Sequence, residues 1–192
     1  MRLLTHFFYV LFLLSLTSCT VSSSIAKEKD TPDFSELIIT TSDTDVLLFA
    51  QLKNSFTEEM IQGVKSGIPI QFSFKVELYK VRKNWFNKKT RVIHFKHIMT
   101  YNTLKDSYQV ELQEVNHRIY SFSSLIEGQK SMNEVNGLKV SPLANLIEDA
   151  NYLLRVKAEF SEEVPSTGFH RLTAFFGLLD SQTEWHDIAF KY

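Results

Sequence analysis

The sequence has 192 residues, of which 44% are hydrophobic, 22% charged and 13% aromatic. Six glycines, four prolines and one cysteine exclude a disordered protein, a collagen-like repeat and a disulfide-stapled miniprotein. The 21 basic and 22 acidic residues nearly balance, which argues against a dedicated nucleic-acid binder. Sixteen phenylalanines favour a bulky, aromatic-rich core, and the length suits one domain.

The amino terminus has the pattern of a bacterial signal peptide. Residues 3–16 form an uncharged apolar run after Arg2, shorter than the about 20 apolar residues that a membrane-spanning helix needs. The run ends in the letters LTSC, which resemble the lipobox of bacterial lipoproteins, where the cysteine receives the lipid and becomes the new amino terminus. We therefore expect a signal peptide over residues 1–18 and a lipidated, palmitate-bearing Cys19 that holds the protein on a membrane.

Two other interpretations of this end stay open. Cleavage after Ala26 would release the protein into the periplasm, and an uncleaved apolar run would act as an anchor. Thr20 stands where aspartate is the usual retention signal for the inner membrane, so the lipoprotein resemblance favours the outer membrane, facing the periplasm. Residues 19–33 are then the lipidated cysteine with its flexible tether, and residues 34–192 form a single domain.

Alternation of apolar and polar residues predicts strands along most of this domain. From Ile68 to Leu78 every second residue is apolar, which predicts a strand with one buried and one solvent-facing side. The alternation slips after Leu78 and indicates a bulge or a second packed face. Inward-facing positions include Phe72, Phe74, Phe95 and Phe160. Further strands are predicted over residues 37–41, 46–52, 93–101, 108–112, 119–122, 138–141, 151–160 and 185–192.

Two short helices are predicted between the strands, because Ser55 and Ser124 each begin a capping-box pattern. The first helix should end at Gly67 and the second at Asn136-Gly137. Their predicted buried side chains are Phe56, Met60 and Val64 in the first, and Leu125, Met132 and Val135 in the second. Local hairpins with only two helical insertions favour a mainly β fold, an antiparallel β-sandwich of immunoglobulin-like or similar type.

Signatures of catalysis are absent from the sequence. It has no phosphate-binding glycine loop, no G-x-S-x-G, no H-E-x-x-H and no paired cysteines. His94 and His97 look like a metal pair, but a spacing of three in a strand places them on opposite faces. The other candidates are scattered at His117, His170 and His186. We predict a protein that is not an enzyme and has no metal or cofactor; a hydrolase with dispersed catalytic residues is the enzymatic alternative.

A basic, aromatic segment should form the tip of the hairpin after the strand that ends at Leu78. Such a patch suits anionic headgroups, an acidic envelope protein or another anionic surface; single-stranded nucleic acid is not an expected ligand after export. The alternative, which the sequence favours, is a solvated hairpin whose lysines protect a sheet edge while Trp85 folds back onto the core. The candidate interaction residues are Lys80, Arg82, Lys83, Trp85, Phe86, Lys88, Lys89 and Arg91.

Short motifs follow one another in order along residues 34–190. They are Ser66-Gly67-Ile68-Pro69, Val76-Glu77-Leu78-Tyr79, Arg82 with Trp85, Tyr101-Asn102 with Leu104 and Tyr108, Leu154-Arg155-Val156-Lys157-Ala158, and Trp185. In this order they resemble a bacterial family of exported proteins known only as a domain of unknown function, although Asn102 stands where aspartate is expected. The resemblance implies no activity, cofactor or catalytic residue, and it leaves room for an accessory role beside a membrane sensor.

Two hypotheses for function follow. The first is a non-catalytic, membrane-tethered envelope lipoprotein that binds another envelope component. The alternative is a carrier that holds a lipid or other apolar ligand in a cavity between its two sheets.

Overall fold

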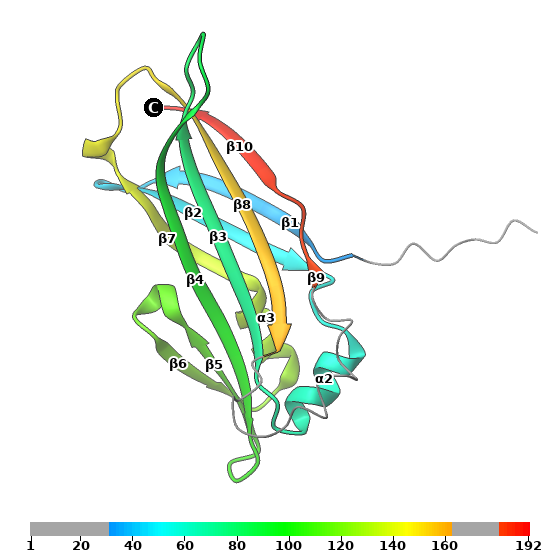
Figure 1. Cartoon of the computed structure of the whole chain (residues 1–192). Helices are drawn as coiled ribbons and strands as arrows, with labels where there is room; N and C mark the ends of the chain where they lie inside the picture. The colour runs from blue at the N-terminus through cyan, green and yellow to red at the C-terminus, as the bar shows by residue number, and fades with distance from the viewer. Residues whose placement is uncertain (1–30, 163–180) are drawn as a thin grey trace, which may run out of the picture.

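The computed structural model describes residues 31–162 and 181–192, and every structural statement below refers to them. The predicted signal peptide, Cys19, most of the tether and His170 lie outside these residues. The described chain folds into two antiparallel sheets that pack on each other, which confirms the predicted β-sandwich (Figure 1).

The larger sheet contains seven strands in the order β10-β8-β3-β4-β5-β6, with β9 also paired to β8. Its strands are β3 (Ile70–Lys80), β4 (Lys88–Asn102), β5 (Ser107–Leu112), β6 (Arg118–Phe122), β8 (Asn151–Glu162), β9 (Ser181–Gln182) and β10 (His186–Lys191). The smaller sheet has the order β1-β2-β7. Its strands are β1 (Asp33–Thr41), β2 (Asp45–Lys53) and β7 (Glu134–Pro142). Two short 3-10 helices, η1 (Gln113–Val115) and η2 (Leu143–Asn145), follow β5 and β7.

Phenylalanine rings fill the space between the sheets. Phe72, Phe74 and Phe160 are at most 1% exposed, as the alternation in β3 and β8 predicts. The rings of Phe72 and Phe160 meet edge to face with centroids 4.7 Å apart, and Phe74 stacks on Phe95 at 4.8 Å. The expectation of inward-facing phenylalanines is therefore confirmed, and these rings give the core its bulk.

The slip in the alternation after Leu78 is a β-bulge. The pairing of β3 with β4 shifts there, because Leu78 lies opposite Arg91 while Tyr79 lies opposite Lys89. The extra residue is Thr90, whose hydroxyl donates a hydrogen bond to the carbonyl of Leu78 at 3.0 Å. The bulge therefore sits at the base of the hairpin that β3 and β4 form.

The predicted solvent-facing side of β3 is less exposed than the alternation predicts. Glu77 is only 3% exposed and Gln71 only 8%, although both lie on the predicted solvent-facing side. β4 and β8 flank β3 on both sides, and their long polar side chains lie across this face. Alternation alone does not report such coverage by neighbouring strands.

The first helix, α2 (Glu58–Lys65), begins later than predicted. Thr57 is its N-cap, with the hydroxyl accepting a hydrogen bond from the Met60 amide at 3.3 Å. Ser55 instead donates to the Asn133 side chain at 2.5 Å, which takes it out of the capping role. Met60 and Val64 are buried as expected.

The second helix, α3 (Leu125–Asn133), ends before the predicted Asn136-Gly137, and the chain continues directly into β7. Val135 is buried as expected, but as a strand residue paired with Ala50 of β2. Gly137 has a positive φ of 74° and sits where the register between β2 and β7 shifts, so it serves a bulge rather than a helix end.

Candidate functional site

The hairpin tip projects beyond the rest of the molecule at one end of the long sheet (Figure 1). Trp85 is 72% exposed and Phe86 is 87% exposed, with ring centroids 6.3 Å apart in an edge-to-face arrangement. The alternative in which Trp85 folds back onto the core is therefore wrong. Two adjacent large aromatic side chains instead stand in solvent, where folding of the domain does not account for them.

The predicted basic residues divide into those at the tip and those below it. Exposed cations surround the aromatic pair, and we call the set Arg82, Lys83, Trp85, Phe86 and Lys88 the tip patch. Lys80 is half-buried at the end of β3. Arg91 lines a separate hollow together with Ser141 and η2 residues, toward the smaller sheet.

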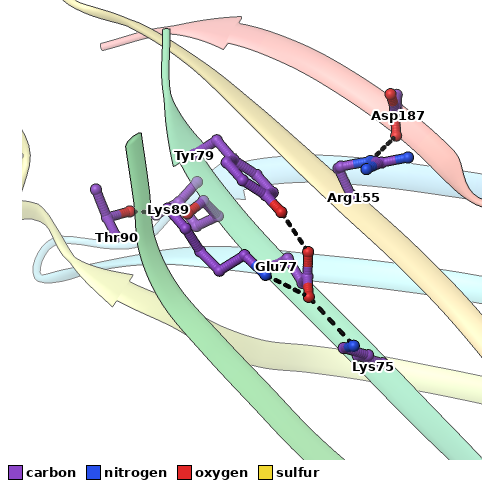
Figure 2. Close-up of polar contacts among 8 residues, drawn as sticks. Lys75, Glu77, Tyr79, Lys89, Thr90, Arg155 and Asp187 are labelled. Carbon is purple, nitrogen blue, oxygen red and sulfur yellow. Dashed lines mark hydrogen bonds and ion pairs between the residues drawn. The ribbon is translucent and has the colours of Figure 1, made fainter. Parts of the chain in front are cut away.

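Lys89 belongs to a partly buried polar network around Glu77 at the hairpin base (Figure 2). Glu77 accepts hydrogen bonds from the Tyr79 hydroxyl at 2.5 Å and from Lys89 Nζ at 2.9 Å, and Lys75 Nζ lies 3.3 Å from the same carboxylate. Burial raises the pKa of the Glu77 carboxyl, but the bonds from Tyr79, Lys89 and Lys75 outweigh it and lower the pKa to about 2. Both carboxylate oxygens thus have partners, and β3 is tied to β4 beneath the tip.

A cation-rich aromatic site lies beside this network on the same face. The ring of Trp185 contacts the Arg155 guanidinium, with Cζ 4.9 Å from the ring centroid, and Lys75 Nζ lies 5.5 Å from that centroid. Arg155 also binds Asp187 of β10 at 2.8 Å, as Figure 2 shows. These contacts link β3, β8 and β10, so Trp185 has a structural role.

The two central histidines lie on opposite faces of β4, as the strand spacing predicts. His94 is exposed, whereas His97 is 0% exposed. His117 pairs with Glu111 on the surface at 2.6 Å, and His186 pairs with Asp33 at 2.9 Å. Within residues 31–162 and 181–192 no group of His, Cys, Asp and Glu has the arrangement of a metal site.

His97 forms a buried pair with Glu114 that sequence analysis missed. Its Nδ1 lies 2.9 Å from the Met132 carbonyl oxygen, and its Nε2 lies 2.9 Å from Glu114 Oε1. A carbonyl oxygen only accepts, so Nδ1 carries a hydrogen, and one further proton must lie between Nε2 and Oε1 because two bare acceptors would repel. The sequence did contain a signal for the burial of His97. Residues 95, 97 and 99 lie on one face of a strand, so His97 shares the inner face of β4 with Phe95 and Met99.

Glu114 lines a groove beside this pair. One hollow of about 580 Å³ lies between the β5–β6 hairpin, α3 and the start of β7, and a second of about 620 Å³ continues along β7. The two hollows share Glu114, Val115 and Asn136, and we call them together the β7 groove. The Glu114 side chain is only 5% exposed, and its Oε2 has no hydrogen-bond partner within the described part of the chain.

The fold and these two surfaces define a small β-sandwich with a projecting basic hairpin at one end and a groove along one edge. No described helix combines the length and apolar character needed to cross a bilayer. A family model, described as a domain of unknown function (DUF4390), matches residues 29–189, and the chain belongs to this family. The match confirms the resemblance, and the family carries no known activity. No curated protein and no solved structure matches the chain.

Proposed function

We propose that this protein is a non-catalytic, lipid-anchored component of the bacterial cell envelope that docks its tip patch on an anionic membrane surface. The exposure of Trp85 and Phe86 among basic side chains is the observation that carries the proposal. Aromatic rings favour the interface between headgroups and acyl chains, and cations favour anionic headgroups.

The energies support a second membrane contact beside the lipid. Each basic residue near an anionic surface contributes about 1 kcal/mol, so Arg82, Lys83 and Lys88 together contribute roughly 3 kcal/mol. Burying the two aromatic rings adds a few kcal/mol more. The lipid expected on Cys19 supplies the anchor, and the tip patch adds a contact between the folded domain and the membrane surface. The tip patch therefore complements a lipid on Cys19.

The size and support of the tip favour lipid over an acidic protein. A stable protein interface takes about 20–30 residues from each side, whereas the tip patch has five residues on one narrow hairpin. The Glu77 network and the Thr90 bond fix the hairpin base, so the two rings are presented with little loss of conformational freedom.

The core argues for a binding surface rather than a carrier cavity. Phe72, Phe74 and Phe160 fill the space between the sheets, where a carried lipid would have to lie. Attachment at Cys19 and the outer membrane facing the periplasm remain parts of the proposal that the amino-terminal sequence supports. The family resemblance leaves room for an accessory role beside a membrane sensor. Palmitate labelling that persists after Cys19→Ser would contradict the anchor.

Vesicle flotation tests the tip. The full chain with Cys19→Ser, which removes the expected lipid, is mixed with vesicles of phosphatidylglycerol and phosphatidylcholine or of phosphatidylcholine alone. We expect binding to the anionic vesicles that weakens at high salt and falls at least about tenfold with Trp85→Ser and Phe86→Ser together.

Leu104→Ser is the matched control. Leu104 is 96% exposed in the turn between β4 and β5, at the opposite end of the long sheet from the tip (Figure 1). Its substitution removes an equally exposed apolar side chain and should leave flotation unchanged. Equal flotation of the tip variant and the parent chain, or equal binding to neutral vesicles, would overturn the proposal.

A further inference from the structure

Glu114 has one oxygen satisfied and one without a partner. Oε1 contacts His97 Nε2 at 2.9 Å, whereas Oε2 is buried and has no hydrogen-bond partner within residues 31–162 and 181–192. Lys130 does not serve it, because its Nζ lies 3.9 Å from Glu134 and its side chain is 71% exposed. A buried acceptor of this kind is rare in folded proteins and calls for a donor from beyond the described residues.

The chemistry of the pair determines what that donor must be. The proton between His97 and Glu114 lies on the Oε1 side, whichever residue holds it, so Oε2 is an acceptor in both cases. A ligand atom that contacts Oε2 must therefore carry hydrogen. Because the contact would be shielded from water, a charged donor would form a stronger bond there than in solution.

The walls of the groove favour a cation with an apolar body. The first hollow carries two further acids beside Glu114, Glu127 and Glu134, against one base, Lys130. The second hollow adds Lys139 and two histidines but no further acid, so the cation is expected in the first hollow. The rest of the hollow is mainly apolar and aromatic, with Leu112, Val115, Tyr120 and Phe122. Its volume of about 580 Å³ lies in the range of sites for small organic ligands.

From these observations we propose that the β7 groove binds an ammonium or guanidinium group attached to an apolar body, with Glu114 Oε2 as the acceptor. The apolar part lies against Leu112 and Phe122, and the cation turns toward Glu114. Oε2 is buried although Glu114 lines the hollow, so the proposal includes a rotation of the Glu114 side chain that brings Oε2 to a ligand seated there. The site is independent of the tip patch and of the lipid anchor.

The methionine methyl groups provide the test. The full chain has four methionines, and Met99 and Met132 are fully buried next to the His97–Glu114 pair. The chain is labelled at its methionine methyls, held in detergent micelles, and titrated with benzamidine, which combines a cationic donor with an apolar ring. None of these methionines lines the groove, but Met132 belongs to α3, which forms one wall, and the Met99 methyl lies against Gly128 of the same helix. We therefore expect saturable NMR shifts at Met99 and Met132, while Met60 of α2, a helix that forms no wall of the groove, stays in place. Methyl benzoate, which donates no hydrogen bond, should produce no saturable shift.

Two variants test whether the binding site is the one proposed. Glu114→Gln keeps the size of the side chain and a contact with His97 but replaces the carboxyl with an amide, which is a weaker acceptor for a cationic donor, and we expect benzamidine affinity to fall at least about tenfold. Glu159→Gln is the control, because Glu159 also forms an ion pair, with Lys157 at 3.6 Å, but both residues lie on β8 and line neither hollow of the groove. It should leave the affinity unchanged.

A third variant guards against a change in fold. Ser131→Trp fills the hollow from α3 and leaves both Glu114 and His97 in the chain, and it should abolish the benzamidine shifts while the Met60 signal keeps its position. Absence of saturable shifts in the parent chain, or equal affinity for the parent, Glu114→Gln and Ser131→Trp, would overturn the proposal.

A second titration distinguishes the two sources of such a cation. A short peptide with arginine between leucines presents the same group on a protein partner. Binding at least about tenfold tighter than benzamidine, and lost with norleucine in place of arginine, assigns the site to a basic segment of a protein. Weaker binding of the peptide than of benzamidine assigns it to a small amine or amidine. Failure of vesicle flotation would leave either result intact.

Discussion

Glu77 and Glu114 are two carboxylates with equally buried side chains, each 5% exposed, and they differ in how their oxygens are used. Glu77 has partners on both oxygens, and all of them come from β3 and β4. Glu114 has one partner, His97, and its second oxygen has none within the described residues. The comparison indicates that Glu77 uses both oxygens in contacts within the sheet. Glu114 instead has one oxygen without a partner among the described residues, and it lies beside the β7 groove.

The largest expected effect on stability comes from breaking the His97–Glu114 pair. His97→Ala should lower the free energy of unfolding by about 3 kcal/mol, because it leaves a cavity beside Phe74 and removes the partner of buried Glu114. Urea unfolding measures the change. His94→Ala, an exposed histidine on the other face of β4, should cost less than about 0.5 kcal/mol. Similar losses in both variants would show that His97 is not held as described.

Removing the charge of Glu77 should lower the free energy of unfolding by less than His97→Ala does. Glu77→Gln at neutral pH should lower the free energy of unfolding by roughly 2 kcal/mol, a value reduced by solvent screening of the half-exposed Lys75 and Lys89. Glu111→Gln breaks an exposed pair and should cost about 0.5 kcal/mol or less. Equal losses in urea unfolding would remove the distinction between a buried network and a surface pair.

The stability that the Glu77 network contributes should be lost in acid. The pKa of Glu77 is about 2 in the folded chain against 4.5 for the free group, so its contribution is fully present above pH 4.5. That contribution is lost as the pH falls from 4.5 through 2, because the carboxyl then takes up a proton. The parent chain should therefore lose roughly 2 kcal/mol more over this range than Glu77→Gln. Parallel pH profiles of stability would contradict the lowered pKa.

The smallest effect on stability is expected at the tip. Trp85→Ser and Phe86→Ser together should change the free energy of unfolding by less than about 0.5 kcal/mol, since both rings already stand in solvent. The same variant should lose vesicle binding. A large loss of stability would mean that these rings pack in the folded protein and are not a free surface.

Strand positions and core phenylalanines were predictable because side chains alternate across a strand and only one face of each strand meets the other sheet. The end of α3 was not, because pairing of Val135 with β2 overrides a local helix pattern that extends to Gly137. The tip was predictable in composition, but the exposure of Trp85 was not, since basic residues beside an aromatic pair suit both alternatives. The groove was beyond reach, because Glu114 and His97 come from separate elements and their contact depends on how η1 closes against β4.

Unfolding with and without benzamidine is the most direct test of the different roles of the two carboxylates. A ligand that binds only the folded chain raises its stability by RT ln(1 + [L]/Kd), so the increment grows with the logarithm of the affinity. Glu77→Gln should be less stable than the parent chain yet gain the same increment from benzamidine, whereas Glu114→Gln should gain much less than the parent. A full benzamidine increment in Glu114→Gln, or a lost increment in Glu77→Gln, would contradict the account.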